Sequence, residues 1–350
     1  MSTYAELFDH GAMSAADAPA FPRGDFIPDV SVIVPTYRRP AMLERCVLAL
    51  AAQTYDTARY EIIVCDDGPD EATKACVQRL SQSRARRGPL IRYVPVTATQ
   101  GPAGARNAGW RASLARRIAF TDDDTIPDPQ WIANGMRALD AGADAVSGRI
   151  VVPLGPHPTD YERDAAGLAS AEFATANAFA TRAALERTGG FDARFTSAWR
   201  EDSDLQFALM KAGLVIARAD DATVLHPVRP ARWGVSISQQ KKSQFDALLF
   251  KKYPAMFRTR IRRNPPLFYY AMLAALVVAV GSIAASAPRV AALALAAWSA
   301  MTIWFSMQRL KTTARTPSHV AEMLWTSAII PYLSIYWRIR GSFKFRVFFL

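Results

Sequence analysis

The sequence feature that most limits the possible folds is a regular alternation of short apolar runs and helical segments over the first 125 residues. Four apolar runs have the length and composition of buried strands, at 30–34, 61–65, 91–94 and 118–120. Helical patterns separate them, at 40–52, at 70–83 and in the segment that follows Gly101. Strands that alternate with helices in this way predict an α/β fold with a doubly wound, mostly parallel sheet.

Polar loops follow these strands at their carboxyl ends. Asp66 and Asp67 end the second strand, Arg106 follows the third, and three carboxylates at 122–124 follow the fourth. Open α/β sheets bind ligands at this edge. Adjacent carboxylates repel one another, so a compact fold gains nothing from the cluster, whereas Mg2+ binds carboxylate oxygens together with substrate phosphates. The run predicts either a divalent-cation site or an acidic turn that ends in a helix cap at Asp128.

The second half of the chain is less regular. We expect helices at 129–139, 183–188 and 200–212, and strands at 143–152, 173–181, 214–217 and 223–225. A Pro/Gly-rich loop is expected at 153–168, and a basic amphipathic helix at 234–253. Glu201 and Asp202 open the third of the helices, and Glu201 and Asp204 could instead simply favour its N-terminus through the helix dipole.

The motifs of several classes of nucleotide-binding and hydrolytic enzymes are absent from the sequence. Gly101, Gly104 and Gly109 do not have the GxGxxG spacing of a dinucleotide site, and no GxxxxGK[ST] loop, zinc-type Cys/His spacing or GxSxG elbow occurs. The cysteines are too few for a disulfide framework and are expected to be core thiols: Cys46, Cys65 and Cys76. The acids and Arg106 at the sheet edge remain, and a bound nucleotide diphosphate with a metal explains them economically.

The C-terminal part of the chain contains two long apolar stretches. Residues 267–287 are 21 residues without a charge, and residues 290–307 are 18. About 20 apolar residues cross a bilayer, so the two stretches predict a transmembrane hairpin, with a buried helical pair as the alternative. Residues 323–337 are shorter and contain Pro331, so we expect a re-entrant or interfacial segment there.

The net charge of +11 is distributed for contact with an anionic membrane surface, and we expect no nucleic-acid partner. Basic residues flank both ends of the predicted hairpin: Lys251, Lys252, Arg258, Arg260, Arg262, Arg263, Arg309, Lys311 and Arg315. Only Arg289 lies at its turn. The positive-inside rule therefore places both ends of the hairpin, and the α/β domain with them, in the cytoplasm.

Motifs in the α/β region resemble a known family. Val32-Ile33-Val34-Pro35-Thr36-Tyr37, Asp66-Asp67-Gly68 and Gly104-Ala105-Arg106-Asn107-Ala108-Gly109 resemble the nucleotide-binding signatures of family 2 glycosyltransferases of the GT-A fold. Asp122-Asp123-Asp124 resembles the DxD metal motif of that family. Gly189-Gly190-Phe191-Asp192 and Glu201-Asp202 resemble its acceptor-side segments. The resemblance covers about residues 30–226, with five motifs in the order of the family.

The resemblance implies a role for each matching residue. The donor-binding set would be Pro35, Thr36, Tyr37, Asp66, Asp67, Arg106, Asp122 and Asp123, with Asp66 at the base and Arg106 near the diphosphate. Asp124 would ligate Mg2+ or Mn2+. Asp202 would be the general base for the acceptor hydroxyl, beside Glu201. His226 falls where some relatives supply a further metal or diphosphate contact, but a lone histidine before a proline is also a common structural residue.

The implied function is inverting, metal-dependent transfer of a sugar from a nucleotide-diphosphate donor to a lipid-linked or membrane-proximal glycan acceptor in cell-envelope synthesis. The segment Arg229-Pro230-Ala231-Arg232-Trp233 lacks the Gln of the QxxRW motif of processive synthases, which favours single addition over a processive polysaccharide synthase. Trp233 suits either acceptor stacking or membrane-interface anchoring. Two further alternatives are a sugar nucleotidyltransferase and a membrane scaffold that binds nucleotide sugars without turnover.

The expected organisation follows from these patterns. It comprises a lead-in at 1–29, a GT-A domain at 30–232 with a nucleotide-binding half (30–125) and an acceptor half (126–232), a basic stem at 233–266, the hairpin at 267–308 and an interfacial or re-entrant basic tail at 309–350. The lead-in lacks the apolar core of a signal peptide. We therefore expect the chain in the inner (cytoplasmic) membrane, with its catalytic domain in the cytoplasm.

Overall fold

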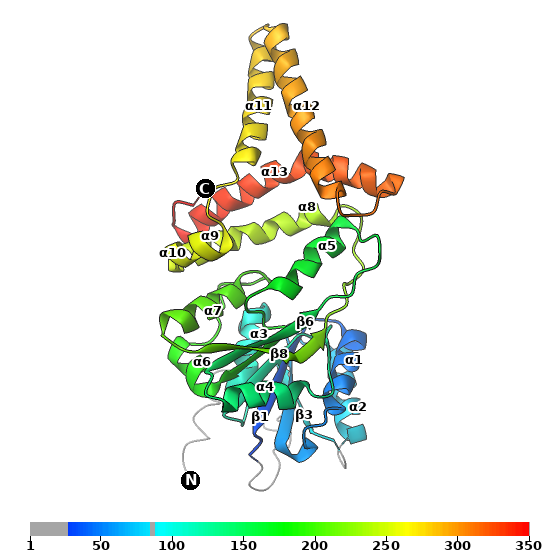
Figure 1. The fold of residues 1–350 in the computed structure, drawn as a ribbon, viewed down its shortest axis with the longest axis vertical. Coiled ribbons are helices and arrows are strands. Elements are labelled where there is room, and N and C mark those ends of the chain that lie inside the picture. Colours follow the sequence, from blue (N-terminus) through cyan, green and yellow to red (C-terminus); the bar gives the residue numbers. More distant parts are fainter. Residues whose placement is uncertain (1–26, 85–87, 350) are drawn as a thin grey trace.

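The computed structural model describes residues 27–84 and 88–349. Most of the predicted lead-in lies outside these residues. Figure 1 shows an α/β domain, a layer of helices above it, and a helical hairpin that projects away from both. Chain segments far apart in sequence therefore meet in the middle layer, between the domain and the hairpin.

The sheet of the α/β domain has eight strands in the order β3-β2-β1-β4-β7-β6-β8-β5. Its first half is parallel and comprises β1 (Val30–Thr36), β2 (Tyr60–Asp66), β3 (Leu90–Pro95) and β4 (Arg117–Thr121). The second half contains β5 (Ile126–Pro127), β6 (Ala145–Val151), β7 (Asn177–Thr181) and β8 (Ile216–Leu225). β7 runs antiparallel to both of its neighbours, so the sheet is mixed. The predicted α/β doubly wound class is confirmed.

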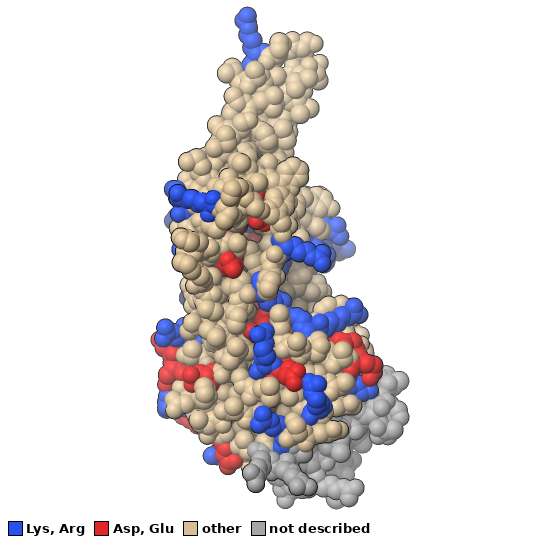
Figure 2. Space-filling model, turned by 90° about the vertical axis from the view of Figure 1, so that its right-hand side faces the viewer, with Lys and Arg blue, Asp and Glu red and all other residues tan. Residues whose placement is uncertain are grey.

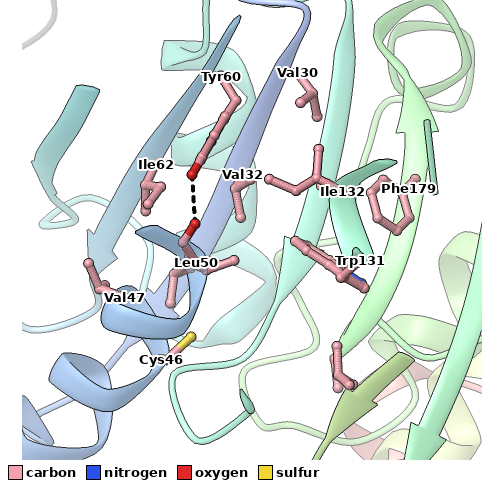
Figure 3. Close-up of a cluster of buried hydrophobic side chains, with 14 of the residues drawn as sticks. Val30, Val32, Cys46, Val47, Leu50, Tyr60, Ile62, Trp131, Ile132 and Phe179 are labelled. Carbon is pink, nitrogen blue, oxygen red and sulfur yellow. Dashed lines mark hydrogen bonds between the residues drawn. The ribbon is translucent and has the colours of Figure 1, made fainter. Parts of the chain in front are cut away.

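Both faces of the parallel half are buried, which explains why its strands read as continuous apolar runs. Val32 belongs to one apolar cluster and its neighbour Ile33 to the other, as the two-residue period of a strand requires. Figure 3 shows the first cluster, where Tyr60 donates a hydrogen bond of 2.7 Å to the Leu50 carbonyl. On the other face of the sheet, a Cβ at Gly109 would lie 2.4 Å from the Ile33 side chain. The helix that contains Gly109 therefore packs on the sheet at a distance that only glycine allows.

Helices cover the parallel half as the alternation predicts. They are α1 (Pro40–Ala51), α2 (Glu71–Arg84) and α3 (Pro102–Ala112). All three cysteines are buried free thiols, as expected. The second half adds α4 (Trp131–Asp140), α5 (Asp160–Ala166), α6 (Arg182–Thr188) and α7 (Glu201–Lys211).

Three expectations for the second half were wrong in detail. The predicted loop at 153–168 contains α5, because Thr159 and Glu162 form a capping box that starts a helix there. The strand expected from residue 173 begins only at Asn177. The two short strands expected at 214–217 and 223–225 are one strand, β8, whose pairing with β6 shifts in register next to Gly148.

The middle layer consists of α8 (Val235–Gln239), α9 (Gln244–Lys252), α10 (Pro254–Met256) and α13 (Pro317–Phe345). The predicted single helix at 234–253 is thus interrupted by a 3-10 turn at Gln240–Ser243. α13 continues through Pro331 and runs beside α9 below the hairpin (Figure 1). A third apolar cluster joins this layer to the α/β domain, with Phe195 and Phe207 packed against Phe245 and Phe345.

The hairpin consists of α11 (Leu267–Ala284) and α12 (Pro288–Leu310). Among the described residues, these two helices are long and apolar enough to cross a membrane, by length and composition. Few of their side chains are buried, and Val277, Val280 and Leu293 are each more than half exposed. In Figure 2 the visible face of the hairpin is almost entirely free of charged side chains, apart from a basic side chain at its tip.

Candidate functional site

The three consecutive acids at the end of β4 differ in their main partners, although Arg39 contacts both Asp123 and Asp124. Asp122 accepts a hydrogen bond of 2.7 Å from Arg106. Asp123 accepts one of 2.7 Å from Thr36 and pairs with Arg39 at 2.9 Å. Asp124 is the only one of the three acids that pairs with residues of the segment after β8. Cations therefore compensate the repulsion within the run.

Asp124 lies against the segment that follows β8. Its carboxylate is 3.0 Å from Nε of Arg229 and 3.5 Å from Nε2 of His226. The backbone N–H of His226 donates to the Val151 carbonyl at 2.9 Å, which holds the histidine at the end of the sheet. The ligand atoms of Asp122, Asp124 and His226 all lie within 4.8 Å of one another. Two carboxylates and an imidazole at this spacing fit a divalent cation such as Mn2+.

Burial and nearby positive charges shift the pKa values of Asp122 and Asp123 in opposite directions. Burial tends to raise the pKa of Asp122, but the charges of Arg106 and His226 outweigh it, so the pKa is lowered. Burial raises the pKa of Asp123 to about 7, although Arg39 and Thr36 lower it. Of these two carboxylates, Asp122 therefore remains ionised more readily than Asp123.

A cavity of about 220 Å³ opens beside the acids. Nine residues predicted for the site line it: Pro35, Thr36, Tyr37, Asp67, Arg106, Asp122, Asp123, Asp124 and His226. Arg39, Pro102, Ala198 and Arg229 complete the lining. Asp66, Glu201 and Asp202 do not line this cavity. The structure thus brings most of the predicted donor-binding residues together with His226, and it leaves Asp66, Glu201 and Asp202 outside this lining.

Asp66 and Asp67 differ in what they leave free for a ligand. One carboxylate oxygen of Asp66 accepts hydrogen bonds from the Tyr93 hydroxyl at 2.8 Å and the Asp70 N–H at 3.2 Å. The other, Oδ1, is buried and has no partner among the described residues. Both oxygens of Asp67 accept from the Gly101 N–H, at 2.8 and 3.0 Å. Asp66 therefore retains an acceptor atom for a ligand, whereas Asp67 fixes the loop before α3.

Arg106 joins the two groups of acids. Its guanidinium donates to Asp122 and also to Glu201, at 3.3 Å, while only 3% of the residue is exposed. Burial and the charge of Asp202 raise the pKa of Glu201 to about 8. Burial also raises the pKa of Asp202, whose carboxylate accepts a hydrogen bond of 2.5 Å from Thr175. The Glu-Asp pair thus lies one side chain away from the acidic run.

The first turn of α7, which carries that pair, is held from the middle layer. Arg200 precedes it with a φ of 74°, a left-handed conformation that is strained for arginine. Its Nε donates to Asp246 of α9 at 2.7 Å, and Arg338 of α13 donates to the same carboxylate at 3.3 Å. Lys252 of α9 binds Asp204, one turn into α7, at 2.6 Å. The position of the pair therefore depends on helices beside the hairpin.

Sequence reasoning missed three groups that contact site residues. Arg39 and Arg229 pair with Asp123 and Asp124, and Thr175 holds Asp202. Arg39 follows the first strand by three residues, at the same sheet edge as the acids, and this position could have identified it. Nothing near Thr175 in the sequence marks it, because it meets Asp202 only through the fold.

Comparisons with known proteins agree with this architecture. A family model described as Glycosyl transferase family 2 matches residues 31–204, about half of the chain. Glycosyltransferase AglE of Haloferax volcanii is 28% identical over 214 residues, which cover 58% of this chain and 68% of that protein. The UDP-Glc:alpha-D-GlcNAc-diphosphoundecaprenol beta-1,3-glucosyltransferase WfgD of Escherichia coli is 35% identical over 105 residues, covering 30% of this chain and 37% of that protein.

A solved structure shares the fold over most of the chain. It is the mannosyltransferase PcManGT from Pyrobaculum calidifontis in complex with GDP-Man and Mn2+, with a TM-score of 0.56 and 20% identity, covering 91% of this chain and 88% of that chain. The match supports the GT-A architecture of the sheet. The motifs of the acidic run, the family match and this fold agree. The chain belongs to glycosyl transferase family 2 and is a glycosyltransferase with a GT-A fold.

Proposed function

We propose that this enzyme transfers one sugar, with inversion, from a nucleoside-diphosphate donor to a lipid-linked or membrane-proximal acceptor in cell-envelope glycan synthesis. Family 2 membership supports a nucleotide-sugar donor. The observation that carries the proposal is Arg106, which joins Asp122 at the cavity to Glu201 of the Glu-Asp pair. Through this contact, a donor bound at the acids and an acceptor activated by the pair would meet.

The donor side supplies groups for each part of a nucleoside diphosphate. Asp66 would accept a hydrogen bond from the base through its free oxygen. Arg39, Arg106 and Arg229 line the cavity, and guanidinium groups bind phosphate oxygens in a bidentate manner. These cations now neutralise the acidic run, so they would exchange carboxylate partners for phosphate when the donor binds.

Asp122, Asp124 and His226 are the residues that would hold a divalent cation. When bound, such a cation supplies Lewis-acid stabilisation of the negative charge on the diphosphate leaving group. The Pyrobaculum enzyme was solved with Mn2+, which supports this metal for the present chain. The imidazole in the set favours Mn2+ over Mg2+, because Mg2+ prefers oxygen ligands.

Asp202 would take the proton of the acceptor hydroxyl. It is partly exposed, its pKa is raised by burial, and Thr175 orients one of its oxygens. A base with a pKa nearer to the working pH transfers protons more effectively in the transition state. Attack from the face opposite the leaving diphosphate would invert the anomeric carbon.

Two features support a membrane-proximal acceptor. The hairpin α11–α12 exposes apolar side chains along its length and has basic residues at its base. The name of the Escherichia coli relative describes an acceptor on diphosphoundecaprenol. The hairpin would anchor the enzyme in the inner membrane with the catalytic domain in the cytoplasm. The missing Gln before Arg232 supports single addition.

The decisive experiment measures turnover and donor binding of Asp202→Asn in membranes supplied with a panel of nucleotide sugars. We expect turnover to fall by about 10²–10⁴-fold, the usual contribution of a general base, with nucleotide affinity nearly unchanged. Asp220→Asn is the matched control, because Asp220 lies on the exposed part of β8 and pairs with Arg218. Turnover near that of the wild type in D202N would refute the assignment of the base.

A second measurement tests the metal. EDTA should abolish nucleotide release from the wild-type enzyme, and added Mn2+ should restore it. Activity that is insensitive to the chelator would remove the cation from the proposal. The length of the product on a defined acceptor then separates single from repeated addition.

A further inference from the structure

A buried arginine lies below the base of the hairpin with most of its hydrogen-bond donors unused. Arg338 of α13 is only 3% exposed. Its Nη2 donates to Asp246 at 3.3 Å, whereas its Nε and Nη1 are buried and have no hydrogen-bond partner among the described residues. Buried polar groups are nearly always paired, because an unpaired group has lost its hydrogen bonds to water. A ligand that accepts hydrogen bonds would therefore stabilise this guanidinium.

The positive charge of Arg338 is also only partly compensated. Its partner Asp246 accepts a shorter hydrogen bond, of 2.7 Å, from Arg200, so one carboxylate faces two guanidinium groups. Burial lowers the pKa of Arg338; Asp246 counteracts this shift, and the charge of Arg262 adds to it. A buried charge without a full counter-charge is costly. The charge balance therefore favours an anionic ligand.

A second unpaired group belongs to the first turn of α11. The hydroxyl oxygen of Tyr270 is buried and has no hydrogen-bond partner among the described residues. Tyr270 and Arg338 interact electrostatically, so the two groups lie close together. Figure 1 shows α11 rising from the level of α13, near the C-terminal end of the chain. A hydroxyl and a guanidinium both donate hydrogen bonds to phosphate oxygens.

The surroundings of these two groups suit the surface of a membrane. Tyr336 and Phe343 of α13 are 50% and 81% exposed, and Arg262 and Arg263, shortly before α11, are exposed as well. Aromatic and basic side chains are enriched at the level of lipid headgroups, and the cytoplasmic leaflet contains anionic lipids. Exposed apolar side chains such as Val277 continue along α11. A lipid held by its headgroup at this level would place its acyl chains beside them.

We propose that Arg338 and Tyr270 form a binding site for the headgroup phosphate of an anionic membrane lipid. Nε and Nη1 of Arg338 and the hydroxyl of Tyr270 donate to the phosphate, and the exposed Arg262 adds a second positive charge. The lipid supplies the negative charge that Asp246 alone does not provide. None of these residues lines the cavity beside the acidic run, so the lipid is a bound component rather than a substrate. This inference rests on the proposed membrane anchoring and on none of the proposed chemistry.

The test measures lipid binding to the full chain in micelles of a neutral detergent. The probe is dioctanoyl-phosphatidylglycerol, and native mass spectrometry quantifies the protein with bound lipid. We expect Tyr270→Phe to weaken binding about 10-fold and Arg338→Gln about 10- to 100-fold, since hydrogen bonds to charged groups contribute this much. The matched controls are Tyr336→Phe and Arg340→Gln, which change exposed side chains of the same helix α13 and should bind as the wild type does.

Thermal unfolding separates an effect on binding from an effect on folding. Without lipid, the Tyr270 hydroxyl has no hydrogen bond to lose, so Y270F should unfold at the temperature of the wild type or above it. With phosphatidylglycerol, the unfolding temperature of the wild type should rise more than that of Y270F, because a ligand stabilises the folded state according to its affinity. A lower unfolding temperature of lipid-free Y270F would show that the hydroxyl is bonded within the protein and would overturn the assignment.

Two competitors define the ligand. Inorganic phosphate offers the same oxygen atoms without acyl chains and should not displace the probe at the same concentration. Dioctanoyl-phosphatidylcholine has the phosphate but no net charge and should bind at least 10-fold more weakly. Displacement by inorganic phosphate, equal binding of phosphatidylcholine, or wild-type affinity in both Y270F and R338Q would each overturn the proposal.

The outcome is independent of the test of the base. D202N should bind phosphatidylglycerol as the wild type does while its turnover is lost. If D202N kept its turnover and Y270F lost lipid affinity, the proposed chemistry would fail and the lipid site would stand. If Y270F and R338Q kept their affinity while D202N lost turnover, the lipid site would be refuted and the proposed function would stand.

Discussion

The proposed donor side and the proposed acceptor side of this site are held in different ways. On the donor side, Asp123 is bound by Thr36 and Asp66 by Tyr93, which all lie within the first 125 residues. On the acceptor side, the first turn of α7 is held by Asp246 and Lys252 of α9. The proposed donor side is thus organised mainly by its own strands and loops, with Asp124 also contacted by His226 and Arg229, whereas the proposed acceptor side depends on helices that lie beside the hairpin.

This difference indicates that the position of α7 is coupled to the helices below the hairpin. α9 packs along α13, and a Cβ at Gly341 of α13 would lie 2.4 Å from the backbone of Gln244. Helices in such close contact move together. A shift of α13 would therefore reach Arg200 through Asp246.

The largest effect is expected from Lys252→Met. Lys252 lies between Asp192 and Asp204, at 2.8 and 2.6 Å, and Asp204 is almost fully buried. Removing the cation leaves two carboxylates close together, so the free energy of unfolding should fall by on the order of 3 kcal/mol. Thermal and denaturant unfolding in detergent measure this loss. Lys74→Met is the control, since its pair with Glu71 is exposed.

The same variant has a defined pH dependence. Burial raises the pKa of Asp204 to about 6 even with Lys252 present, and loss of the cation raises the pKa further. A carboxyl with a raised pKa in the folded state stabilises the protein below its unfolded pKa and loses this contribution as the pH rises through the folded pKa. K252M should therefore be closer to the wild type at pH 5 than at pH 8. A constant difference would show that Asp204 does not titrate.

The next largest effect is expected from Asp246→Asn, which removes the charge that compensates Arg200 and the buried Arg338. The strained start of α7 would shift, and Asp202 with it. Small misplacements of catalytic groups can cost about 100-fold, so we expect turnover to fall roughly 10- to 100-fold. The KM of the donor should stay within about twofold, because the nucleotide side does not contact Asp246.

Steady-state kinetics with both substrates separate these effects, and Asp246→Glu should recover part of the turnover. Asp140→Asn serves as the control, since it removes a surface ion pair with Arg117. An equal change in donor KM and turnover would contradict the separation of the two halves.

The parallel half of the fold could be predicted because its physics is local. Each strand there is buried on both faces, which makes it a continuous apolar run, and each polar loop lies at a strand end. The acids at 122–124 and the free oxygen of Asp66 follow from that geometry. Nine of the predicted site residues accordingly line the cavity beside the acidic run, and Arg39, Pro102, Ala198 and Arg229 were not predicted to line it.

The acceptor half could not be predicted to the same depth, because its contacts join distant positions. Asp246 meets Arg200 across 46 residues and Arg338 across 92. α13 continues through Pro331, although proline removes a helical hydrogen bond. In contrast, the start of α5 had a local signal in Thr159 and Glu162, and it was missed because the surrounding Pro and Gly residues suggested a loop.

A smaller effect is expected from Thr175→Val, which removes the hydrogen bond to Asp202. Burial raises the pKa of Asp202 and this bond lowers it, so its loss should raise the pKa further. The base must be ionised to act, and the acid limb of kcat/KM should move to higher pH by about one unit, since hydrogen bonds to charged groups contribute about 1.5 kcal/mol or more. Thr223→Val is the control, because the Thr223 hydroxyl donates only to the Asp220 carbonyl on the exposed part of β8. An acid limb that does not shift would show that the Thr175 hydroxyl does not affect the pKa of Asp202.

The smallest effect is expected on the donor side, from Tyr93→Phe. The hydroxyl of Tyr93 donates to Asp66, which keeps a second hydrogen bond from Asp70. Loss of one such bond typically costs about 1 kcal/mol, so nucleotide affinity should fall about fivefold with turnover unchanged. Tyr55→Phe is the matched control. The Tyr55 hydroxyl also donates to a carboxylate, that of Asp29 at 2.7 Å, but this pair does not line the cavity.

The double variant Y93F/D246N tests whether the two sides of the site act independently. If the two halves are independent, the fivefold loss of nucleotide affinity and the loss of turnover should combine without interaction, as is usual for distant sites. An interaction larger than about 0.5 kcal/mol would mean that the halves communicate. Arg106 is then the route to examine, because it contacts Asp122 on one side and Glu201 on the other. Repeating the cycle in Arg106→Lys, which keeps the charge but not the two-sided contact, should abolish such an interaction.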